Sequence, residues 1–227
     1  MSGGSSRSPE LQLLKHVPDP VRTEIASRLR VIRAAKGRTL VEKGSRSTDV
    51  FFLLEGRAKV LLYSSSGREV CVHNIGPGDT FGDIAVLDGE PRSASILAST
   101  ELRVVVMRAK DFMTCLESSP EAALWLARNL ASCVRRLTDQ VFELSALNVQ
   151  ARLHCELLRL ARSGEQCNGV IEVRPAPTQA ELASRIGTHR EAVTREMRAL
   201  SEAGIIRYGR RTLVIVDLAR LEQFVNR

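Results

Sequence analysis

The sequence predicts an α+β protein built from an N-terminal β-roll of the jelly-roll type, one long dimerisation helix and a C-terminal winged helix-turn-helix. Three observations predict this fold. Short β-rich segments punctuated by glycine occupy residues 37–108, a continuous helical pattern starts at Pro120, and a capped helix-turn-helix spacing starts at Thr178. We expect the three parts to be residues 1–119, 120–148 and 149–227.

The first part opens with two short helical segments, at Leu11–His16 and Pro20–Arg30. The β-rich segments that follow are each of strand length, and the polar stretch 64–67 has the composition of a hairpin loop. The expected strands are Thr39–Gly44, Val50–Gly56, Ala58–Tyr63, Glu69–Ile75, Ser95–Ala98 and Glu101–Met107. Many short strands at regular spacing are typical of a sandwich or a roll.

Charge is unevenly distributed along the chain. The 227 residues carry a formal net charge of +7, and residues 151–227 contain 13 arginines, no lysine and nine carboxylates. Arginine forms bidentate contacts with phosphate and guanine that lysine cannot form. The C-terminal part therefore favours an acidic partner such as nucleic acid.

Cysteine usage and hydropathy place the protein in the cytoplasm. The five cysteines are odd in number and form no Cys-x-x-Cys pair, so we expect reduced thiols and no metal site. The first eight residues contain no apolar stretch of a secretion signal, and no apolar segment reaches membrane-spanning length. We expect no contact with a membrane.

A candidate ligand site follows the glycine-rich turn 74–80. Glycine permits a close approach of backbone to ligand, a short apolar turn begins after an acidic residue, and an arginine fork and a serine hydroxyl come next. The residues are Gly82, Asp83, Ile84, Ala85, Arg92 and Ser93. A carboxylate for ribose hydroxyls and donors for phosphate suit a sugar phosphate. The alternative is a tight turn of the roll that binds nothing.

The helical stretch from Pro120 carries apolar residues at alternating steps of three and four, the a/d pattern of a two-stranded coiled coil. This seam consists of Ala127, Leu130, Val134, Leu137, Val141 and Leu144. The helix faces outside this seam carry charged residues, which favours a homodimer over a helix packed on its own sheet. Asn148 marks a break before a second helix that runs to Arg162, and we expect a strand at Cys167–Arg174.

Residues 178–197 have helix-turn-helix spacing. Thr178 and Glu181 form the two ends of a capping box, and Gly187 suits the left-handed turn. With Val193 buried, the outer face of the second helix near its start consists of Arg190, Glu191, Thr194 and Arg195. Arginine pairs with guanine and glutamate accepts from cytosine, so this face predicts readout of a G·C-containing half-site in a major groove. The alternative is a plain pair of packed helices.

Further residues suit the phosphate backbone. Thr178 and His189 lie at the two helix starts, and Arg210 and Arg211 lie at the tip of a hairpin between residues 204 and 216. This hairpin makes the domain winged, and a closing helix is expected at Asp217–Phe224.

Two resemblances extend this interpretation. The segment Phe81–Ser95 resembles the phosphate-binding cassette of cyclic-nucleotide-binding domains, with Asp83 where that family has Glu. Roll, long helix and winged domain together resemble the bacterial CRP/FNR superfamily of transcription regulators, and the second helix resembles its cyclic-AMP-receptor branch. The resemblance implies cAMP or cGMP as effector, double-stranded DNA with palindromic TGTGA-like half-sites, a homodimer and a contact with RNA polymerase. It also places Thr138 beside the nucleotide base.

Two other interpretations stay open at this stage. One is the same DNA-binding role with a non-nucleotide effector or none. Residues 1–70 contain no cysteine for an iron–sulfur centre, but Cys71-Val72-His73 has the Cys-x-His spacing of haem-binding relatives. The other is a cyclic-nucleotide-binding regulatory subunit of an enzyme. The sequence contains neither Gly-x-Ser-x-Gly nor a P-loop, so the chain itself is expected to be a binding protein and not an enzyme.

Overall fold

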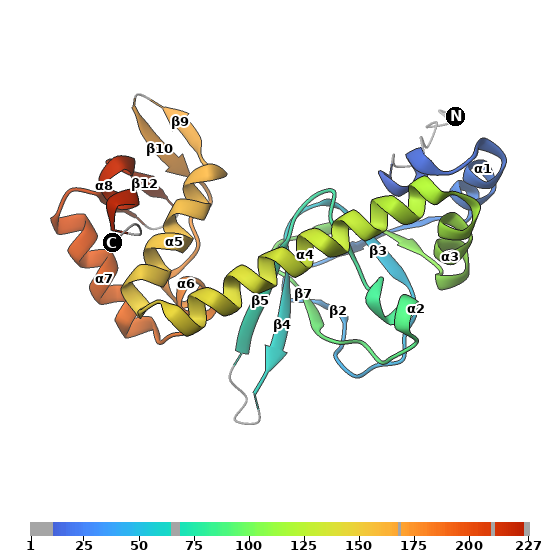
Figure 1. Cartoon of the computed structure of the whole chain (residues 1–227), viewed down its shortest axis with the longest axis horizontal. Coiled ribbons are helices and arrows are strands. Elements are labelled where there is room, and N and C mark those ends of the chain that lie inside the picture. Colours follow the sequence, from blue (N-terminus) through green and yellow to red (C-terminus); the bar gives the residue numbers. More distant parts are fainter. Residues whose placement is uncertain (1–10, 65–68, 168, 210–211, 225–227) are drawn as a thin grey trace. The chain divides into compact units, whose positions relative to one another are not determined.

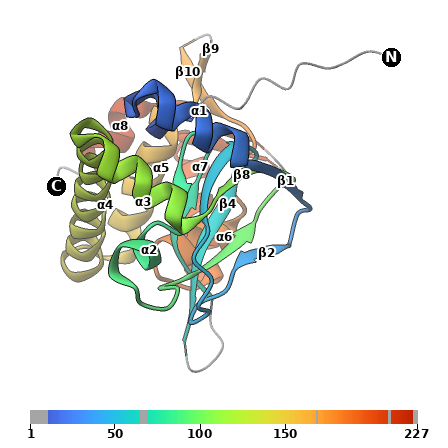
Figure 2. The ribbon, with the colours of Figure 1, turned by 90° about the vertical axis from the view of Figure 1, so that its right-hand side faces the viewer.

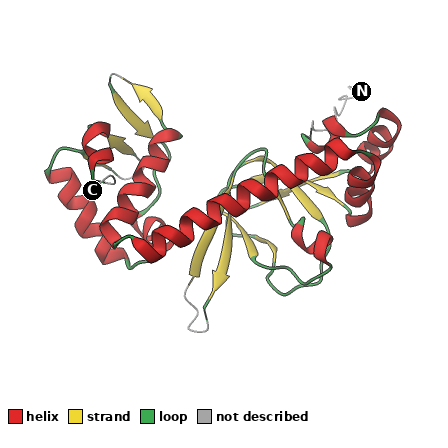
Figure 3. Cartoon of the chain, viewed as in Figure 1, coloured by secondary structure: helices red, strands yellow, loops and turns green. Residues whose placement is uncertain are grey.

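The structure is a computed structural model that describes residues 11–64, 69–167, 169–209 and 212–224. The chain divides into two compact units, residues 1–134 and 135–227, and each is described by itself. Figure 1 labels the elements, and Figure 3 separates helices from strands. The expected β-roll, long helix and winged helix-turn-helix are all present, which confirms the fold class. The division into three domains at residues 119 and 148 stays a prediction.

The first unit begins with a 3-10 helix, η1 (Leu13–His16), and helix α1 (Asp19–Arg28). Strand β1 (Arg30–Ala34) follows directly, where the sequence analysis extended a helix to Arg30 and predicted no strand. The reason is tertiary: the backbone of Leu29 is already extended, and β1 pairs along its length with β8.

Two four-stranded antiparallel sheets form the roll. One has the order β1-β8-β3-β6 and the other β2-β7-β4-β5. The remaining strands are β2 (Thr39–Val41), β3 (Val50–Glu55), β4 (Ala58–Tyr63), β5 (Glu69–Ile75), β6 (Thr80–Phe81), β7 (Ser95–Ala98) and β8 (Leu102–Met107). The strands expected within residues 39–107 are thus confirmed, and those at 58–63, 69–75 and 95–98 have the predicted bounds.

Both faces of the two central strands of the first sheet, β3 and β8, are buried, which explains their runs of consecutive apolar residues. In β8, Val104 and Val106 belong to the core inside the roll, whereas Val105 and Met107 belong to a second core under the helices. Side chains alternate between the faces of a strand, so a sheet covered on both sides needs apolar residues at consecutive positions. Inside the roll, the rings of Phe51 and Phe81 stack with centroids 5.0 Å apart.

The second core of the first unit, which we call the outer core, is covered by helices. Helix α3 (Ala109–Ser118), which the sequence analysis did not predict, lies beside α1 (Figure 2). It buries Phe112 and Cys115. The first turns of α4 (Pro120–Ala146) add Ala122 and Leu126 to the same core.

The long helical stretch is broken where the sequence predicts. Helix α4 ends at Ala146, and α5 (Val149–Arg162) begins after Asn148, whose side chain accepts a hydrogen bond of 2.9 Å from the Ala151 N–H. In the described part of the chain, no helix combines the length and the apolar character needed to cross a bilayer.

The second unit is a small sheet and a cluster of helices. Its elements are β9 (Glu165–Cys167), β10 (Val170–Val173), α6 (Gln179–Arg185), α7 (Arg190–Glu202), β11 (Ile206–Tyr208), β12 (Leu213–Ile215) and α8 (Leu218–Gln223). The sheet order is β11-β12-β10-β9. The single strand predicted for residues 167–174 is a hairpin of β9 and β10 instead, because β10 pairs on both sides, with β9 and with β12.

Candidate functional sites

The cassette of the first unit is organised around a buried arginine. Arg92 is only 3% exposed, and its guanidinium donates three hydrogen bonds to the protein. Nε donates to Ser47 Oγ at 3.0 Å, Nη1 to the Gly82 carbonyl at 2.5 Å, and Nη2 to the Asp49 carbonyl at 2.6 Å. Because a guanidinium has five N–H groups, two remain beyond these three contacts. The fork expected to face a phosphate is therefore already oriented by the chain itself.

The loop between β2 and β3 supplies two of the three contacts of the Arg92 guanidinium, and the sequence analysis missed this loop. We call these contacts, together with the one to Gly82, the Arg92 clamp. The loop backbone pairs with the arginine in both directions: the Gly44 N–H donates to the Arg92 carbonyl at 2.8 Å, and the Arg92 N–H donates to the Ser45 carbonyl at 2.9 Å. Ser47 and Asp49 in the same loop then reach the guanidinium. No local sequence signal links residues so far apart.

Gly82 is required by the same clamp. Its φ of +85° lies in the left-handed region, and a Cβ there would lie 2.7 Å from Arg92 Nη1 and 2.9 Å from the Asp49 carbonyl oxygen. Both observations exclude an ordinary side chain. The close backbone approach expected at this glycine serves the arginine.

Asp83 immediately precedes the short helix α2 (Ile84–Asp88). Burial raises the pKa of its carboxyl, while the N–H groups of Asp83 and Ile84 and the charge of Arg92 oppose this. Burial likewise lowers the pKa of the Arg92 guanidinium, opposed by Asp49 and Asp83. A partly desolvated carboxylate next to a guanidinium suits a polar ligand that supplies hydroxyl donors and an anion.

The other candidate ligand residues differ in exposure. Ala85 is buried, whereas Ile84 and Ser93 are exposed. Residues 82–85 and 92–93 thus come together in one segment with the clamp. Thr138 lies on α4 in the second unit, and its assignment stays a prediction.

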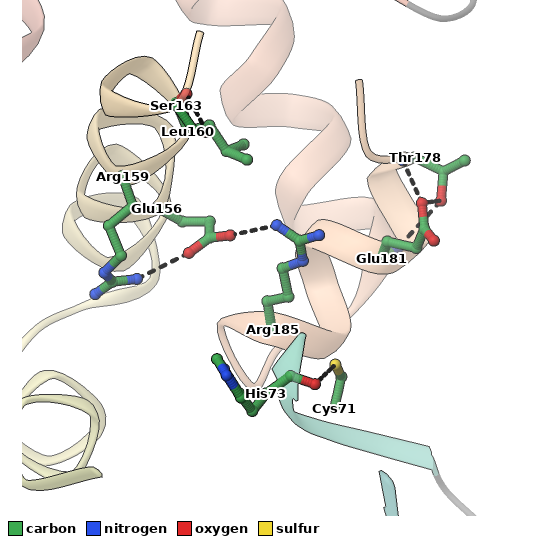
Figure 4. Close-up of polar contacts among 9 residues, drawn as sticks. All are labelled: Cys71, His73, Glu156, Arg159, Leu160, Ser163, Thr178, Glu181 and Arg185. Atoms are coloured by element: carbon green, nitrogen blue, oxygen red, sulfur yellow. Dashed lines mark hydrogen bonds and ion pairs between the residues drawn. The ribbon is translucent and has the colours of Figure 1, made fainter. Parts of the chain in front are cut away.

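The helix-turn-helix of the second unit forms as its caps predict. The Glu181 N–H donates to Thr178 Oγ1 at 3.2 Å, and the Thr178 N–H donates to Glu181 Oε2 at 2.8 Å, a complete capping box (Figure 4). Gly187 turns with φ +64°, and α7 then buries Val193, Met197 and Leu200 against the core of the unit. These contacts fix which side of α7 faces outward.

The outward side carries the predicted residues. Arg190, Glu191, Thr194 and Arg195 are all exposed. Thr194 Oγ1 donates to Gln179 Oε1 at 2.7 Å, so this threonine also ties α7 to α6, a role the sequence did not indicate. In the described chain, neither Arg190 nor Arg195 has an ion pair with a carboxylate, whereas Arg198 pairs with Glu202 at 2.7 Å.

The phosphate-contact candidates are only partly described. His189 is the exposed N-cap of α7 and makes no side-chain capping bond, and Thr178 caps α6. Arg210 and Arg211 lie outside the described residues, between β11 and β12.

A buried polar cluster under α7 was also missed. Glu196 is 8% exposed, and its carboxylate contacts His154 Nε2 at 2.8 Å and Gln150 Nε2 at 2.7 Å on α5. The available signal is its spacing, since Glu196 lies three residues after the buried Val193 and so on the same helix face.

Comparison with known proteins matches a family model to each part of the chain that holds a candidate site. Residues 31–119 match the cyclic nucleotide-binding domain, and residues 151–224 match the Crp-like helix-turn-helix domain. The "CRP-like cAMP-activated global transcriptional regulator" of Mycobacterium tuberculosis (strain CDC 1551 / Oshkosh) is 29% identical over 198 residues, which cover 87% of this chain and 88% of the relative.

Two solved structures share the fold. A CooA mutant from Carboxydothermus hydrogenoformans has a TM-score of 0.77 at 22% identity and covers 88% of each chain. The c-di-GMP responsive global regulator CLP of Xanthomonas campestris has a TM-score of 0.72 at 17% identity, covering 86% of this chain and 98% of that one.

Replacing Gly82 by alanine is expected to destabilise the first unit more than the same change at Gly89. Each position has positive φ, which costs a non-glycine residue about 1–2 kcal/mol. Only at Gly82 does the new Cβ also meet Arg92 and the Asp49 carbonyl, since nothing lies within 4 Å of a Cβ at Gly89. Urea unfolding of the two variants measures the difference, and equal losses would contradict the clamp.

The buried carboxyl of Asp83 predicts a pH-dependent stability. Because its pKa is raised in the folded chain, ionisation disfavours folding. This contribution is most favourable below the ordinary carboxyl pKa of about 3.9 and is lost as pH rises through the folded pKa. Asp83→Asn is therefore expected to be more stable than the parent near neutral pH and to lose that advantage in acid, as followed by urea unfolding across pH. A less stable Asn variant at neutral pH would show that attraction to Arg92 outweighs burial.

Proposed function

This chain belongs to the CRP/FNR family of transcription regulators, and from that premise we propose a homodimeric, sequence-specific DNA-binding regulator controlled by a cyclic nucleotide in its β-roll. The family consists of DNA-binding regulators, not enzymes. The observation that carries the proposal is the outer face of α7, where two exposed arginines without a carboxylate partner in the described chain stand on a helix whose other side is buried. We place this activity in the cytoplasm, with RNA polymerase as a further partner.

The proposed DNA contact uses the first turns of α7 in a major groove. Arg190 and Arg195 read guanine, and Glu191 accepts from the cytosine amino group. Thr194, held by Gln179, keeps the first turn of α7 against α6. Thr178, His189, Arg210 and Arg211 are assigned to phosphates, which fix register and not sequence. The expected half-site is TGTGA-like.

The proposed dimer is supported by the exposure of the α4 seam. Val134 is 62% exposed and Val141 63% exposed, with Leu137 and Leu144 also exposed. A spaced line of apolar residues left in water on one helix is the pattern that a second copy of the same helix covers. Two-fold symmetry then presents two copies of α7 to a palindrome.

The proposed effector is cAMP, with cGMP as the close competitor. Ser93 and the two remaining N–H groups of Arg92 are assigned to the phosphate, and Asp83 is assigned to the ribose hydroxyls. Gly82, Ile84 and Ala85 are assigned to the stretch of backbone that lies beside the phosphate. Thr138 is assigned to the base. The M. tuberculosis relative, named as cAMP-activated, supports cAMP as the effector.

A different effector is the second candidate. The guanidinium of Arg92 already makes three contacts with the protein, and CLP, a structural neighbour, is named as c-di-GMP responsive. In either case, the effector controls DNA binding only if it binds the DNA-competent state more tightly than the other state. The role of an enzyme's regulatory subunit is not supported, because the matched relatives are transcription regulators.

Fluorescence anisotropy on a TGTGA palindrome, titrated with cAMP or cGMP, tests both halves of the proposal. We expect Arg195→Ala to weaken binding to the palindrome by about 1–3 kcal/mol and leave nucleotide binding intact. Arg92→Ala is expected to abolish the nucleotide response, and Ser93→Ala, a smaller change at an exposed residue, is expected to reduce it. Both variants are expected to leave the basal DNA affinity unchanged.

The controls separate the two halves. A scrambled duplex at matched salt controls for phosphate contacts, which bind any sequence. Equal affinity for both duplexes would overturn the predicted half-site. An affinity that neither nucleotide changes would overturn the effector while leaving DNA binding intact.

Val141→Glu is expected to weaken dimerisation about tenfold or more, because it places two carboxylates in an apolar seam. The matched control is Asp139→Lys, which changes charge on the same helix outside the seam. Sedimentation equilibrium measures both variants. If Val141→Glu remains as dimeric as the control, the seam is not the interface.

A further inference from the structure

A chain of ion pairs crosses the second unit from the end of α4 to the first helix of the helix-turn-helix. Glu156 on α5 is 8% exposed, and its carboxylate is shared between two arginines. Oε1 accepts from Arg185 Nη1 at 2.7 Å, and Oε2 accepts from Arg159 Nη1 at 2.8 Å (Figure 4). Arg159 Nη2 in turn pairs with Glu143 on α4.

The positions of the partners show which helices these ion pairs connect. Arg185 is the last residue of α6 and directly precedes the turn at Ile186 and Gly187, so holding it fixes where α7 begins. Glu143 lies in the last turn of α4, the helix of the proposed dimer seam. Arg152 adds a second link, since its Nη1 donates to the carbonyls of Leu144 and Leu147 at 3.4 and 3.2 Å.

Burial of the Glu156 carboxylate restricts how its arginine partners can be arranged. A carboxylate removed from water is stable only while its partners stay in place, so the Glu156 carboxylate favours one arrangement of its two arginines. Exposed pairs lack this constraint. The Glu172–Arg174 pair shows the contrast, because the Glu172 side chain is 28% exposed and the Glu156 side chain 10% exposed.

We propose that Glu156 is a positioning residue for DNA recognition: it holds the C-terminal end of α6, and through Arg159 it fixes the helix-turn-helix to the end of α4. It contacts no DNA itself. The Glu156–Arg185 contact sets the helix-turn-helix on α5, and the Arg159–Glu143 contact sets that assembly on the proposed dimer helix. This inference rests on the proposed DNA-binding dimer for its functional consequence only.

Hydrogen exchange of the full-length free protein tests the bridge without any DNA. In Glu156→Gln, the amides of α6 and the following turn are expected to exchange about tenfold faster, while those of α8 keep the parent rate. Glu172→Gln, which removes the same charge from a less buried pair of the same unit, is expected to match the parent. Unchanged exchange in α6, or equal acceleration throughout the unit, overturns the positioning role.

DNA affinity then separates the two contacts. Glu156→Gln is expected to weaken binding to a single TGTGA half-site by about tenfold at matched salt. The loss on the palindrome is expected to be larger, because this change also removes the contact with Arg159. Glu143→Gln leaves Glu156 and Arg185 in place, so it is expected to weaken binding to the palindrome and leave the half-site unchanged. An unchanged ratio of palindrome to half-site affinity overturns the link to α4.

The outcomes for the two proposals remain distinct. If the parent protein binds TGTGA and scrambled duplexes equally, the proposed half-site is wrong, and the exchange data still decide the role of Glu156. If the parent discriminates and Glu156→Gln retains full affinity and parental exchange, the positioning role is wrong and the proposed function stands.

Discussion

Burial of charge is the constraint on which both candidate sites depend. A guanidinium or carboxylate removed from water must be surrounded by hydrogen-bonding partners, and those partners have to come from wherever the fold can supply them. Arg92 obtains Ser47 and two backbone carbonyls, one of them from a glycine that no other residue type can replace without a clash. The cassette is thus organised around its arginine, and the guanidinium that we propose as the contact for an anionic effector is oriented in advance.

The second unit applies the same constraint to helix placement. Apolar contacts of Val193, Met197 and Leu200 hold α7 to the core, but such contacts are non-directional. Glu196 and Glu156 add direction, because Glu196 is buried against His154 and Gln150 of α5, and Glu156 against Arg185 of α6. Reading bases in a groove requires an orientation as well as a buried face, and the buried carboxylates supply it.

The exposed side of α4 complements these closed clusters. Its first turns bury Ala122 and Leu126 in the outer core of the first unit, and Leu130 of the predicted seam packs partly against the same core. The seam residues from Val134 to Leu144 are exposed. One helix thus serves as part of a core at its start and as an open apolar surface farther along. Within the second unit, the Glu143–Arg159 ion pair connects the last turn of α4 to α5.

What the sequence determined by itself is everything that local chemistry controls. The capping box of Thr178 and Glu181, the left-handed Gly187 and the break at Asn148 depend on neighbours within a few residues, and all were predictable. The strands at 58–63, 69–75 and 95–98 were predictable from their composition, although their pairing partners were not. The outer face of α7 followed from helical periodicity once Val193 was taken as buried.

Only the tertiary structure decided the rest. Strand β1 forms because β8 pairs with it, and the Cys167–Arg174 segment becomes a hairpin because β10 pairs on both sides. Two of the three partners of the Arg92 guanidinium, Ser47 and Asp49, lie more than 40 residues away in the chain, and those of Glu156 include Arg185 at 29 residues. A sequence shows which groups need a partner when buried, but the partner is chosen by whichever distant segment the fold brings within hydrogen-bonding distance.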